Sequence, residues 1–437
     1  MLALLLLAIA VLGTLSSTVF LALALVAARR WRRQHALPSR PPASDPASAA
    51  DHEDDDAAKG RGASVLKPVH GMEPRLRQNL ESFFRIEHPE FELIFCARRA
   101  DDPALQLARE LSAQSPAVKV QIIACGEPPW TNAKVYSLEK MTQLARYPVL
   151  VISDSDVRVE PGYLRDVAAP LSDAVAVAAA TPANSDPRLI AGGGPKFGTG
   201  LGPDVGPGVV TCLYRGVPAE DDGLWSRLEA LGMSVEMTSG VLIAEMLEGM
   251  RFALGPTMAT RKDVLETIGG FARMADYASD DYLLGNWAAE AGYSVELSGH
   301  VIDHIVLHRD WRSSWAHQVR WMKTTRYSRP KGHFGAGLTF AMPFGLLALA
   351  AGALGNHMLL GAALFAWAYL NRVWQSVAIG WGVVRDPRAL AQCWLYPARD
   401  LLGFFLWMAS YGSNEISWRG EKYRMLPGGK MEKIEMK

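Results

Sequence analysis

One short apolar run that ends in two carboxylates constrains the fold of this chain more than any other stretch. Residues 147–158 read YPVLVISDSDVR, so the apolar residues 149–152 are soon followed by Asp154 and Asp156. Such a run is typical of a strand buried on both faces of a parallel sheet, where ligands bind at the carboxyl ends of the strands. Two acids there favour a cation, Mg²⁺ or Mn²⁺, held with a phosphate. In isolation, Asp-Ser-Asp also fits a surface turn.

Strand-like and helical segments alternate on the amino-terminal side of this run. The strand-like runs cover 64–68, 91–96 and 118–123, and helical spacing covers 76–84 and 104–111. Strands alternating with helices of about ten residues indicate the α/β class, with a doubly wound parallel sheet. We assign this domain to residues 63–306 and expect it to carry the chemistry.

The amino-terminal segment has the composition of a membrane anchor. Residues 1–28 carry no charged side chain, and four arginines follow within residues 29–33. A helix of this length exceeds the ~30 Å hydrocarbon core, and a signal peptide would carry its charges before the apolar run. The positive-inside rule places everything after Arg33 in the cytoplasm. We therefore predict a transmembrane anchor over 1–33, followed by a disordered linker over 34–62 that is rich in Pro, Ala, Ser and Asp.

The carboxyl-terminal third also has membrane character. Residues 307–333 interleave Trp and Tyr with Arg and Lys, which predicts an amphipathic helix in the membrane interface. The same composition fits single-stranded nucleic acid, but apolar segments follow at once. Over 334–413 we expect two to three membrane segments, the last of them either a span with an internal Arg399–Asp400 ion pair or a re-entrant segment. Residues 414–437 then form a basic cytoplasmic tail.

Composition excludes several classes of protein. The 45 basic and 45 acidic residues balance, so there is no overall basic character of a nucleic-acid binder, and we expect no nucleic-acid partner. The four cysteines are widely separated, which argues against a zinc site built on cysteine and against a disulfide framework. This cysteine usage fits a reducing compartment.

Four motifs in a fixed order carry a family resemblance. They are Asp102, the Asp154-Ser-Asp156 pair, Asp281 and His317-Gln-Val-Arg320-Trp321, with Asn132-Ala-Lys134 between the first two. The set resembles the D, DxD, D, (Q/R)xxRW pattern of family 2 glycosyltransferases, and most of all the ceramide glucosyltransferase branch with its bacterial hopanoid-modifying relatives. Without the resemblance, Asp280 and Asp281 fit helix-capping acids equally well.

The resemblance implies a role for each of these residues. Asp281 matches the catalytic base that deprotonates the acceptor hydroxyl, and Asp156 together with Asp154 matches the ligands of a Mg²⁺ or Mn²⁺ cofactor. The residues implied to bind substrate are Lys67, Asp102, Lys134, Asp154, His317, Arg320 and Trp321. For Lys67, a solvated lysine at the end of a strand is an equal alternative. The motif usually begins with Gln or Arg, so His317 is a departure that leaves the donor and acceptor preference open.

These implications add up to one expected function. The fold would be a GT-A-like glycosyltransferase domain, and the reaction an inverting transfer of one hexose or N-acetylhexosamine from a UDP-sugar to a lipid hydroxyl. The acceptor would be a hopanoid, such as bacteriohopanetetrol, or a ceramide, and the protein would lie in the bacterial inner membrane with its catalytic domain in the cytoplasm. The alternatives are a processive polysaccharide synthase of the same family and a non-catalytic membrane protein that binds lipid or nucleotide.

Overall fold

The computed structural model describes residues 1–35, 62–180, 206–219 and 223–434. Residues 36–61 of the predicted linker lie outside these ranges. The described chain forms two compact units, each assembled from segments that are distant in the sequence. One unit comprises residues 33–213 and 248–304, and the other comprises residues 1–32, 214–247 and 305–437. The predicted domain 63–306 therefore differs from the structure, because residues 214–247 belong with the helices at the two ends of the chain.

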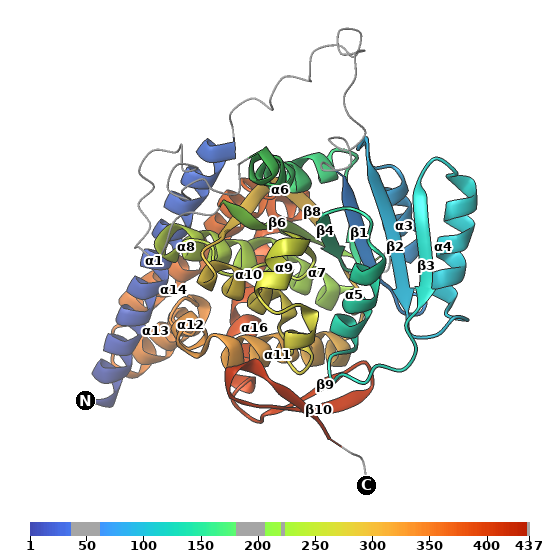
Figure 1. Ribbon diagram of the computed structural model, residues 1–437. Helices are drawn as coiled ribbons and strands as arrows, with labels where there is room; N and C mark the ends of the chain where they lie inside the picture. The colour runs from blue at the N-terminus through green and yellow to red at the C-terminus, as the bar shows by residue number, and fades with distance from the viewer. Residues whose placement is uncertain (36–61, 181–205, 220–222, 435–437) are drawn as a thin grey trace. The chain divides into compact units, whose positions relative to one another are not determined.

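An eight-stranded mixed sheet forms the centre of the first unit, and we call this unit the sheet unit (Figure 1). Its strand order is β3-β2-β1-β4-β7-β6-β8-β5. The strands are β1 (Ala63–Pro68), β2 (Phe91–Ala97), β3 (Lys119–Ala124), β4 (Val149–Ser153), β5 (Val157–Arg158), β6 (Pro207–Pro218), β7 (Thr257–Arg261) and β8 (Ser294–Val306). The helices are α3 (Leu76–Phe84), α4 (Pro103–Gln114), α5 (Ala133–Leu144), α6 (Tyr163–Ala180), α9 (Lys262–Thr267), 3₁₀ helix η4 (Phe271–Met274) and α10 (Asp280–Glu290).

The parallel half of the sheet confirms the predicted α/β class. Strands β3, β2, β1 and β4 run parallel, with β1 paired to β2 on one side and to β4 on the other. Every residue of β1 and β4 is buried, as their continuous apolar runs require. Helix α3 connects β1 to β2 and α4 connects β2 to β3, so the chain moves toward one edge of the sheet. Helix α5 connects β3 to β4, which takes the chain back in the other direction. Because such crossovers are right-handed, α5 lies on the face of the sheet opposite to α3 and α4.

The other half of the sheet departs from the all-parallel expectation. Strand β7 pairs antiparallel with both β4 and β6, and the short β5 pairs antiparallel with β8. The β5–β8 pairing is short, with Val157 opposite His304 and Arg158 opposite Asp303. It places the end of β8 next to the segment that follows β4. Mixed sheets of this kind are common among large α/β proteins.

The second unit is mainly helical, and we call it the helical unit. Its helices are α1 (Leu2–His35, through Arg32), α7 (Leu224–Leu231), the π-helical turn η3 (Gly232–Met237), α8 (Thr238–Glu248), α11 (Trp311–Ser328), α12 (Pro330–Ala336), α13 (Met342–Leu354), α14 (Met358–Gln375), η5 (Ser376–Trp381), α15 (Pro387–Ala391), η6 (Cys393–Leu395) and α16 (Tyr396–Ala409). Its tail contains β9 (Glu415–Trp418), β10 (Glu421–Met425), 3₁₀ turn η7 (Pro427–Gly429) and β11 (Met431–Lys433).

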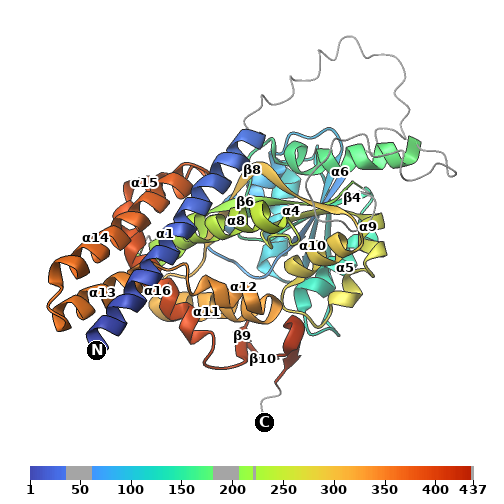
Figure 2. The same cartoon turned by 90° about the vertical axis from the view of Figure 1, so that its left-hand side faces the viewer.

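Two helical stretches among the described residues are long and apolar enough to cross a membrane. They are Leu2–His35 and Leu224–Glu248, and the share of the apolar window that is buried is 28% in the first and 56% in the second. The second therefore has the burial of a core element of its unit. Helix α1 has the length predicted for the anchor, and it lies beside α13 and α14 (Figure 2). Trp367 of α14 donates to the Thr18 hydroxyl of α1 at 2.9 Å.

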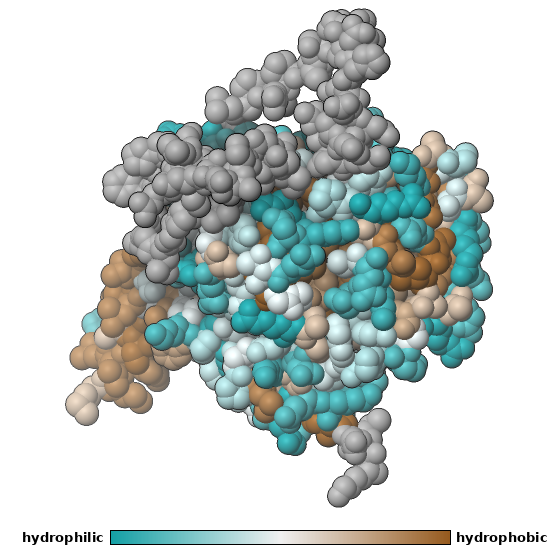
Figure 3. Space-filling model, viewed as in Figure 1, coloured by the Kyte–Doolittle hydropathy of each residue, from teal (hydrophilic) through white to brown (hydrophobic). Residues whose placement is uncertain are grey.

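Small residues allow these helices to pack closely. A Cβ atom built on Gly13 of α1 would lie 2.1 Å from the ring of Phe344, and one built on Gly361 of α14 would lie 2.5 Å from the backbone oxygen of Ala348. Close approach through glycine is typical of helix contacts in membranes. Large apolar side chains remain exposed on the same helices, including Leu12, Leu15, Leu346, Leu359, Leu360, Trp367, Leu370 and Trp374. Figure 3 shows apolar residues gathered over this group of helices.

The carboxyl-terminal helices are shorter than the sequence predicted. The apolar run 334–354 is divided, because α12 ends at Ala336 and α13 begins at Met342. With 13 and 14 residues, α13 and α16 are each about 20 Å long, less than the ~30 Å thickness of a bilayer core. The segment predicted to form the interface helix contains α11, and the place of α11 in a membrane interface stays a prediction. The predicted tail forms an antiparallel sheet of β9, β10 and β11.

The Arg399–Asp400 ion pair is a wrong prediction, because each residue has a different partner. Arg399 lies 2.9 Å from Glu236, and Asp400 lies 3.3 Å from Arg372, which is itself buried. The second oxygen of Asp400 accepts the backbone N–H groups of Ala341 and Met342 at 2.9 and 2.8 Å. Asp400 thus caps the start of α13 from a distant helix and neutralises the arginine of α14.

We expect Asp400→Ala to destabilise the helical unit by about 3 kcal/mol, because it leaves a buried arginine and two amides with fewer partners. The measurement is the midpoint of thermal unfolding of the purified protein in detergent, followed by tryptophan fluorescence. Asp173→Ala, at an exposed position of α6, is the control. Equal midpoints for the two variants would show that the cap contributes nothing.

Candidate active site

The parallel strands bring three of the predicted residues to one edge of the sheet. Lys67 lies near the end of β1, Asp102 lies at the start of the helix that follows β2, and Asp154 directly follows β4. Strand β1 is the central strand of these three. Because the carboxyl ends of parallel strands share one edge, this arrangement agrees with the placement predicted from the sequence.

Lys67 is buried, so the alternative of a solvated lysine is wrong. Its ammonium group donates to the backbone oxygen of Asp154, lies 3.4 Å from the Ser153 hydroxyl and sits 3.8 Å above the Phe83 ring. Burial lowers the pKa of Lys67 to about 7, although the nearby carboxylates of Asp154 and Asp156 oppose this shift. Lys67 therefore fixes the end of β4, and its contact with a nucleotide remains a prediction.

Lys134 lies between two carboxylates that are distant in the sequence. Its ammonium nitrogen lies 2.8 Å from Asp154 and 3.2 Å from Asp280, and only 12% of its side chain is exposed. Burial opposes its charge, but the two carboxylates outweigh burial and raise the pKa of Lys134 above its ordinary value. Lys134 is therefore a fixed positive charge that joins the end of β4 to the start of α10.

Asn132 explains how Lys134 reaches this position. Its side-chain oxygen accepts the backbone N–H groups of Lys134 and Val135, which caps α5. Its side-chain nitrogen donates to the backbone oxygen of Tyr277 at 2.8 Å, and its backbone N–H donates to that of Ala275. One buried asparagine thus ties the start of α5 to the segment that leads into α10. The Asn-Ala-Lys motif was noted in the sequence, but this positioning role was not predicted.

Asp281, the predicted base, lies at the first turn of α10 beside Asp280. Its carboxylate accepts the backbone N–H of Gly255 at 3.0 Å and that of Tyr282 at 2.8 Å. Burial and the neighbouring carboxylate of Asp280 raise the pKa of Asp281 to about 6, and the positive charge of Lys134 opposes this rise. A carboxylate with this pKa can accept a proton near neutral pH and still be ionised beforehand.

His304 is a candidate metal ligand that the sequence analysis missed. Its Nε2 atom lies 3.2 Å from a carboxylate oxygen of Asp156, because β8 pairs with β5 just after the Asp154-Ser-Asp156 turn. Asp156 and His304 thus offer a carboxylate and an imidazole side by side. Carboxylates suit both Mg²⁺ and Mn²⁺, and the added nitrogen favours a transition metal. The only signal in the sequence was a histidine near the end of the strand-like segment 294–306.

Asp102 has a structural role that its sequence context explains. As the residue before Pro103, it caps α4 by accepting the N–H of Ala104 at 2.9 Å. The same carboxylate accepts the N–H of Gly71 at 3.0 Å, which holds the loop after β1. Gly71 has a positive φ of 61°, a conformation that glycine adopts without strain. The substrate contact that the family resemblance implies for Asp102 stays a prediction.

His317, Arg320 and Trp321 lie on α11 in the helical unit. His317 Nδ1 lies 2.9 Å from Glu229, and its ring lies 4.5 Å from that of Trp321. Burial lowers the pKa of His317 to about 4 against the opposing effect of Glu229, so its imidazole is neutral at pH 7 rather than cationic. Arg320 lies over the ring of Trp418 at 5.5 Å. The motif is therefore ordered by contacts within its own unit.

Comparison with known proteins identifies the family. The sequence profile of glycosyl transferase family 21 matches residues 9–193 and 202–431. The chain belongs to this family. Family 21 corrects the predicted placement in family 2.

The curated relatives agree with the ceramide glucosyltransferase branch. Ceramide glucosyltransferase 1 of Caenorhabditis elegans is 24% identical over 85% of this chain and 73% of that protein. A ceramide glucosyltransferase of Komagataella phaffii is 32% identical over 24% of this chain and 21% of that protein. Among solved structures, a mannosyltransferase from Pyrobaculum calidifontis in complex with GDP-Man and Mn²⁺ is 15% identical over 91% of this chain and 98% of that one, with a TM-score of 0.41.

The charges around Asp281 predict opposite pH shifts in two variants. If Asp281 is the base, the rate of glycosyl transfer should fall below about pH 6, where its carboxylate becomes protonated. Lys134→Gln removes a positive charge, raises the pKa of Asp281 and moves this acidic limb to higher pH. Asp280→Asn removes a negative charge and moves it to lower pH. The measurement is the logarithm of kcat/KM against pH, and unchanged limbs in both variants would contradict the assignment of Asp281.

Proposed function

We propose that the protein is an inverting membrane glycosyltransferase that moves one hexose or N-acetylhexosamine from a UDP-sugar to a lipid hydroxyl. The observation that supports this most is the convergence of Asp154, Lys134 and the Asp280–Asp281 pair at one place in the sheet unit of a family 21 chain. The three elements that carry these groups come from separate parts of the sequence. Such convergence of charged, partly buried groups is typical of an active site.

In the proposed reaction, the acceptor oxygen attacks the anomeric carbon of the sugar as its bond to the diphosphate breaks. Asp281 takes the hydroxyl proton, and UDP leaves with the electrons of the broken bond. A single displacement of this kind inverts the anomeric centre. Two backbone N–H groups donate to the carboxylate of Asp281 and fix its orientation, so the side chain needs little reorganisation before proton transfer.

Asp154, Asp156 and His304 would hold the divalent ion. The ion would supply positive charge for the departing diphosphate. Lys134 would add a second positive charge once a phosphate competes for it with Asp154 and Asp280. Lys67 and Asp102 would keep the loops of β1 and β2 in place around the nucleotide.

The lipid acceptor and the membrane location are supported by the helical unit. Helix α1 is long enough to span a bilayer, and the helices beside it expose large apolar side chains. Arginines 29, 30, 32 and 33 at the end of the apolar run favour a cytoplasmic sheet unit. We propose a bacterial inner-membrane enzyme whose acceptor is a hopanoid such as bacteriohopanetetrol, or a ceramide, as in the names of the curated relatives.

A lipid-product assay tests this proposal. Purified full-length protein in detergent with Mn²⁺ or Mg²⁺ receives radiolabelled UDP-glucose or UDP-N-acetylglucosamine and either bacteriohopanetetrol or ceramide. We expect one labelled lipid and a loss of about 10²–10⁴-fold in rate for Asp281→Asn, with Asp173→Asn as the matched control. A growing insoluble polymer would indicate a polysaccharide synthase. No product with any metal would support a protein that only binds lipid or nucleotide.

The assignment of His304 makes a separate prediction. His304→Ala removes one metal donor but leaves Asp154 and Asp156, so activity should return at a higher Mn²⁺ concentration. We expect the half-saturating Mn²⁺ concentration to rise about tenfold or more, since even indirect metal partners contribute about 10–100-fold in affinity. The control is His300→Ala, which removes another histidine of β8, one that pairs with Asp166 of α6. Equal Mn²⁺ dependence in both variants would exclude His304 as a ligand.

A further inference from the structure

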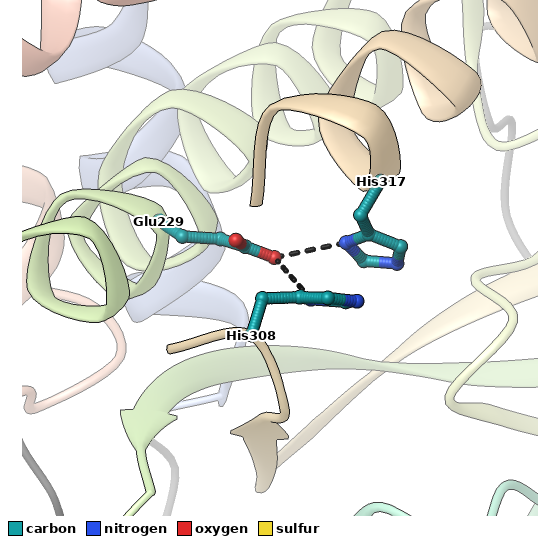
Figure 4. Close-up of side chains that lie close together, drawn as sticks. All are labelled: Glu229, His308 and His317. Atoms are coloured by element: carbon teal, nitrogen blue, oxygen red, sulfur yellow. Dashed lines mark hydrogen bonds and ion pairs between the residues drawn. The ribbon is translucent and has the colours of Figure 1, made fainter. Parts of the chain in front are cut away.

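Three metal-binding side chains meet inside the helical unit. Glu229 comes from α7, His308 from the segment after β8, and His317 from α11 (Figure 4). One ligand atom from each residue lies within 4.8 Å of the other two. The Glu229 side chain is 1% exposed, and those of His308 and His317 are 24% and 16% exposed. A nearly buried carboxylate is thus directed at two imidazoles.

Two of the three separations between ligand atoms are close to those of a tetrahedral metal site. Glu229 Oε1 lies 2.9 Å from His317 Nδ1 and 3.4 Å from His308 Nδ1. Two ligands bound at about 2.0–2.1 Å to a tetrahedral ion are about 3.3–3.4 Å apart. The observed distances differ from this spacing by a few tenths of an ångström. The imidazoles stack with ring centroids 4.1 Å apart, so binding requires a modest rotation of one ring.

Hydrogen bonds between the three side chains explain the cluster less completely than a bound metal ion does. His317 is close enough to share a hydrogen bond with Glu229, but the buried Nδ1 atom of His308 has only the longer 3.4 Å contact with the same carboxylate oxygen and forms no hydrogen bond among the described residues. A buried nitrogen of this kind is destabilising unless another partner is present. An ion between the three side chains would satisfy every one of these groups.

Neighbouring polar groups orient the carboxylate as they do around known metal ligands. The Ser314 hydroxyl donates to the other oxygen of Glu229 at 2.5 Å, and the amide of Gln318 donates to Ser314 at 2.9 Å. This chain of hydrogen bonds leaves Oε1 directed at the histidines. Supporting partners of this kind fix the orientation of metal ligands and increase metal affinity.

We propose that Glu229, His308 and His317 bind a transition-metal ion, with Zn²⁺ as the ion that fits best. Two imidazoles and one carboxylate suit Zn²⁺ and exclude a preference for Mg²⁺, which selects oxygen ligands. Three protein ligands leave one position for water or another ligand. The ion links α7 to the start of α11, which carries Arg320 and Trp321. It also gives a reason for histidine, rather than Gln or Arg, at position 317.

Metal analysis of the purified protein tests this proposal. Full-length protein without a polyhistidine tag is stripped with a chelator, supplied with equimolar Zn²⁺ in the presence of excess Mg²⁺, and passed through a gel-filtration column. We expect about one Zn²⁺ per chain in the wild type, since one three-residue site is present. Loading with Co²⁺ instead should give the visible absorption of a tetrahedral site. A wild type that retains no Zn²⁺ overturns the proposal, whatever the behaviour of the variants.

Matched variants locate the ion. His308→Gln, His317→Gln and Glu229→Gln should each weaken Zn²⁺ binding by at least tenfold, and Ser314→Ala by about tenfold or more. The controls are His333→Gln, a buried histidine bonded to Ser410 in the same unit, and His357→Gln, an exposed one. Zn²⁺ binding that is equally weak in the controls, or equally strong in the ligand variants, overturns the site. Asp281→Asn should bind Zn²⁺ like the wild type, so this test does not depend on the proposed transfer reaction.

Discussion

The ammonium group of Lys134 between Asp154 and Asp280 is the interaction on which the sheet unit depends most. Each contact is worth about 5 kcal/mol of Coulomb energy at an effective dielectric constant near 20, and desolvation offsets much of it. Without the lysine, three carboxylates at the ends of β4 and α10 would repel one another in a largely buried space. The fold therefore allows a high density of negative charge at one place, which is the condition for holding a metal and a phosphate together.

The parallel half of the sheet and its acidic residues were predictable from local sequence. Strands β1, β2 and β4 are short apolar runs, and the periodicity of α3 and α4 follows from burial of one face. Asp102, Asp154 and Asp281 stand next to such elements, so their place in the fold follows once the elements are known. The pattern contains no information about whether neighbouring strands in the second half are parallel, and β6 and β7 were therefore missed.

The remaining site residues were not predictable because their contacts are not local. His304 contacts Asp156, which is 148 residues away in the sequence, and Asn132 contacts Tyr277, which is 145 residues away. Glu229 gives no sign in the sequence that it will face His308 and His317. These contacts are set by sheet pairing and helix packing, which a single sequence does not specify. The family profile adds the order of the motifs but not the side chains that orient them.

The hydropathy of the carboxyl-terminal third predicted where the apolar helices lie in the sequence, but it did not predict how long each helix is. A continuous apolar run does not reveal the break between α12 and α13, and adjacent charges such as Arg399 and Asp400 suggest an ion pair that the helix geometry separates.

The cap that Asp400 provides for α13 also has a consequence for biosynthesis. Met342 leaves the ribosome 58 residues before the carboxylate that accepts its amide hydrogen. At about 5–20 residues per second, the first turn of α13 waits roughly 3–12 seconds for this partner. During that interval the leading amides of α13 lack the partner that they have in the folded unit. Capping of α13 can therefore be completed only after α16 has been synthesised.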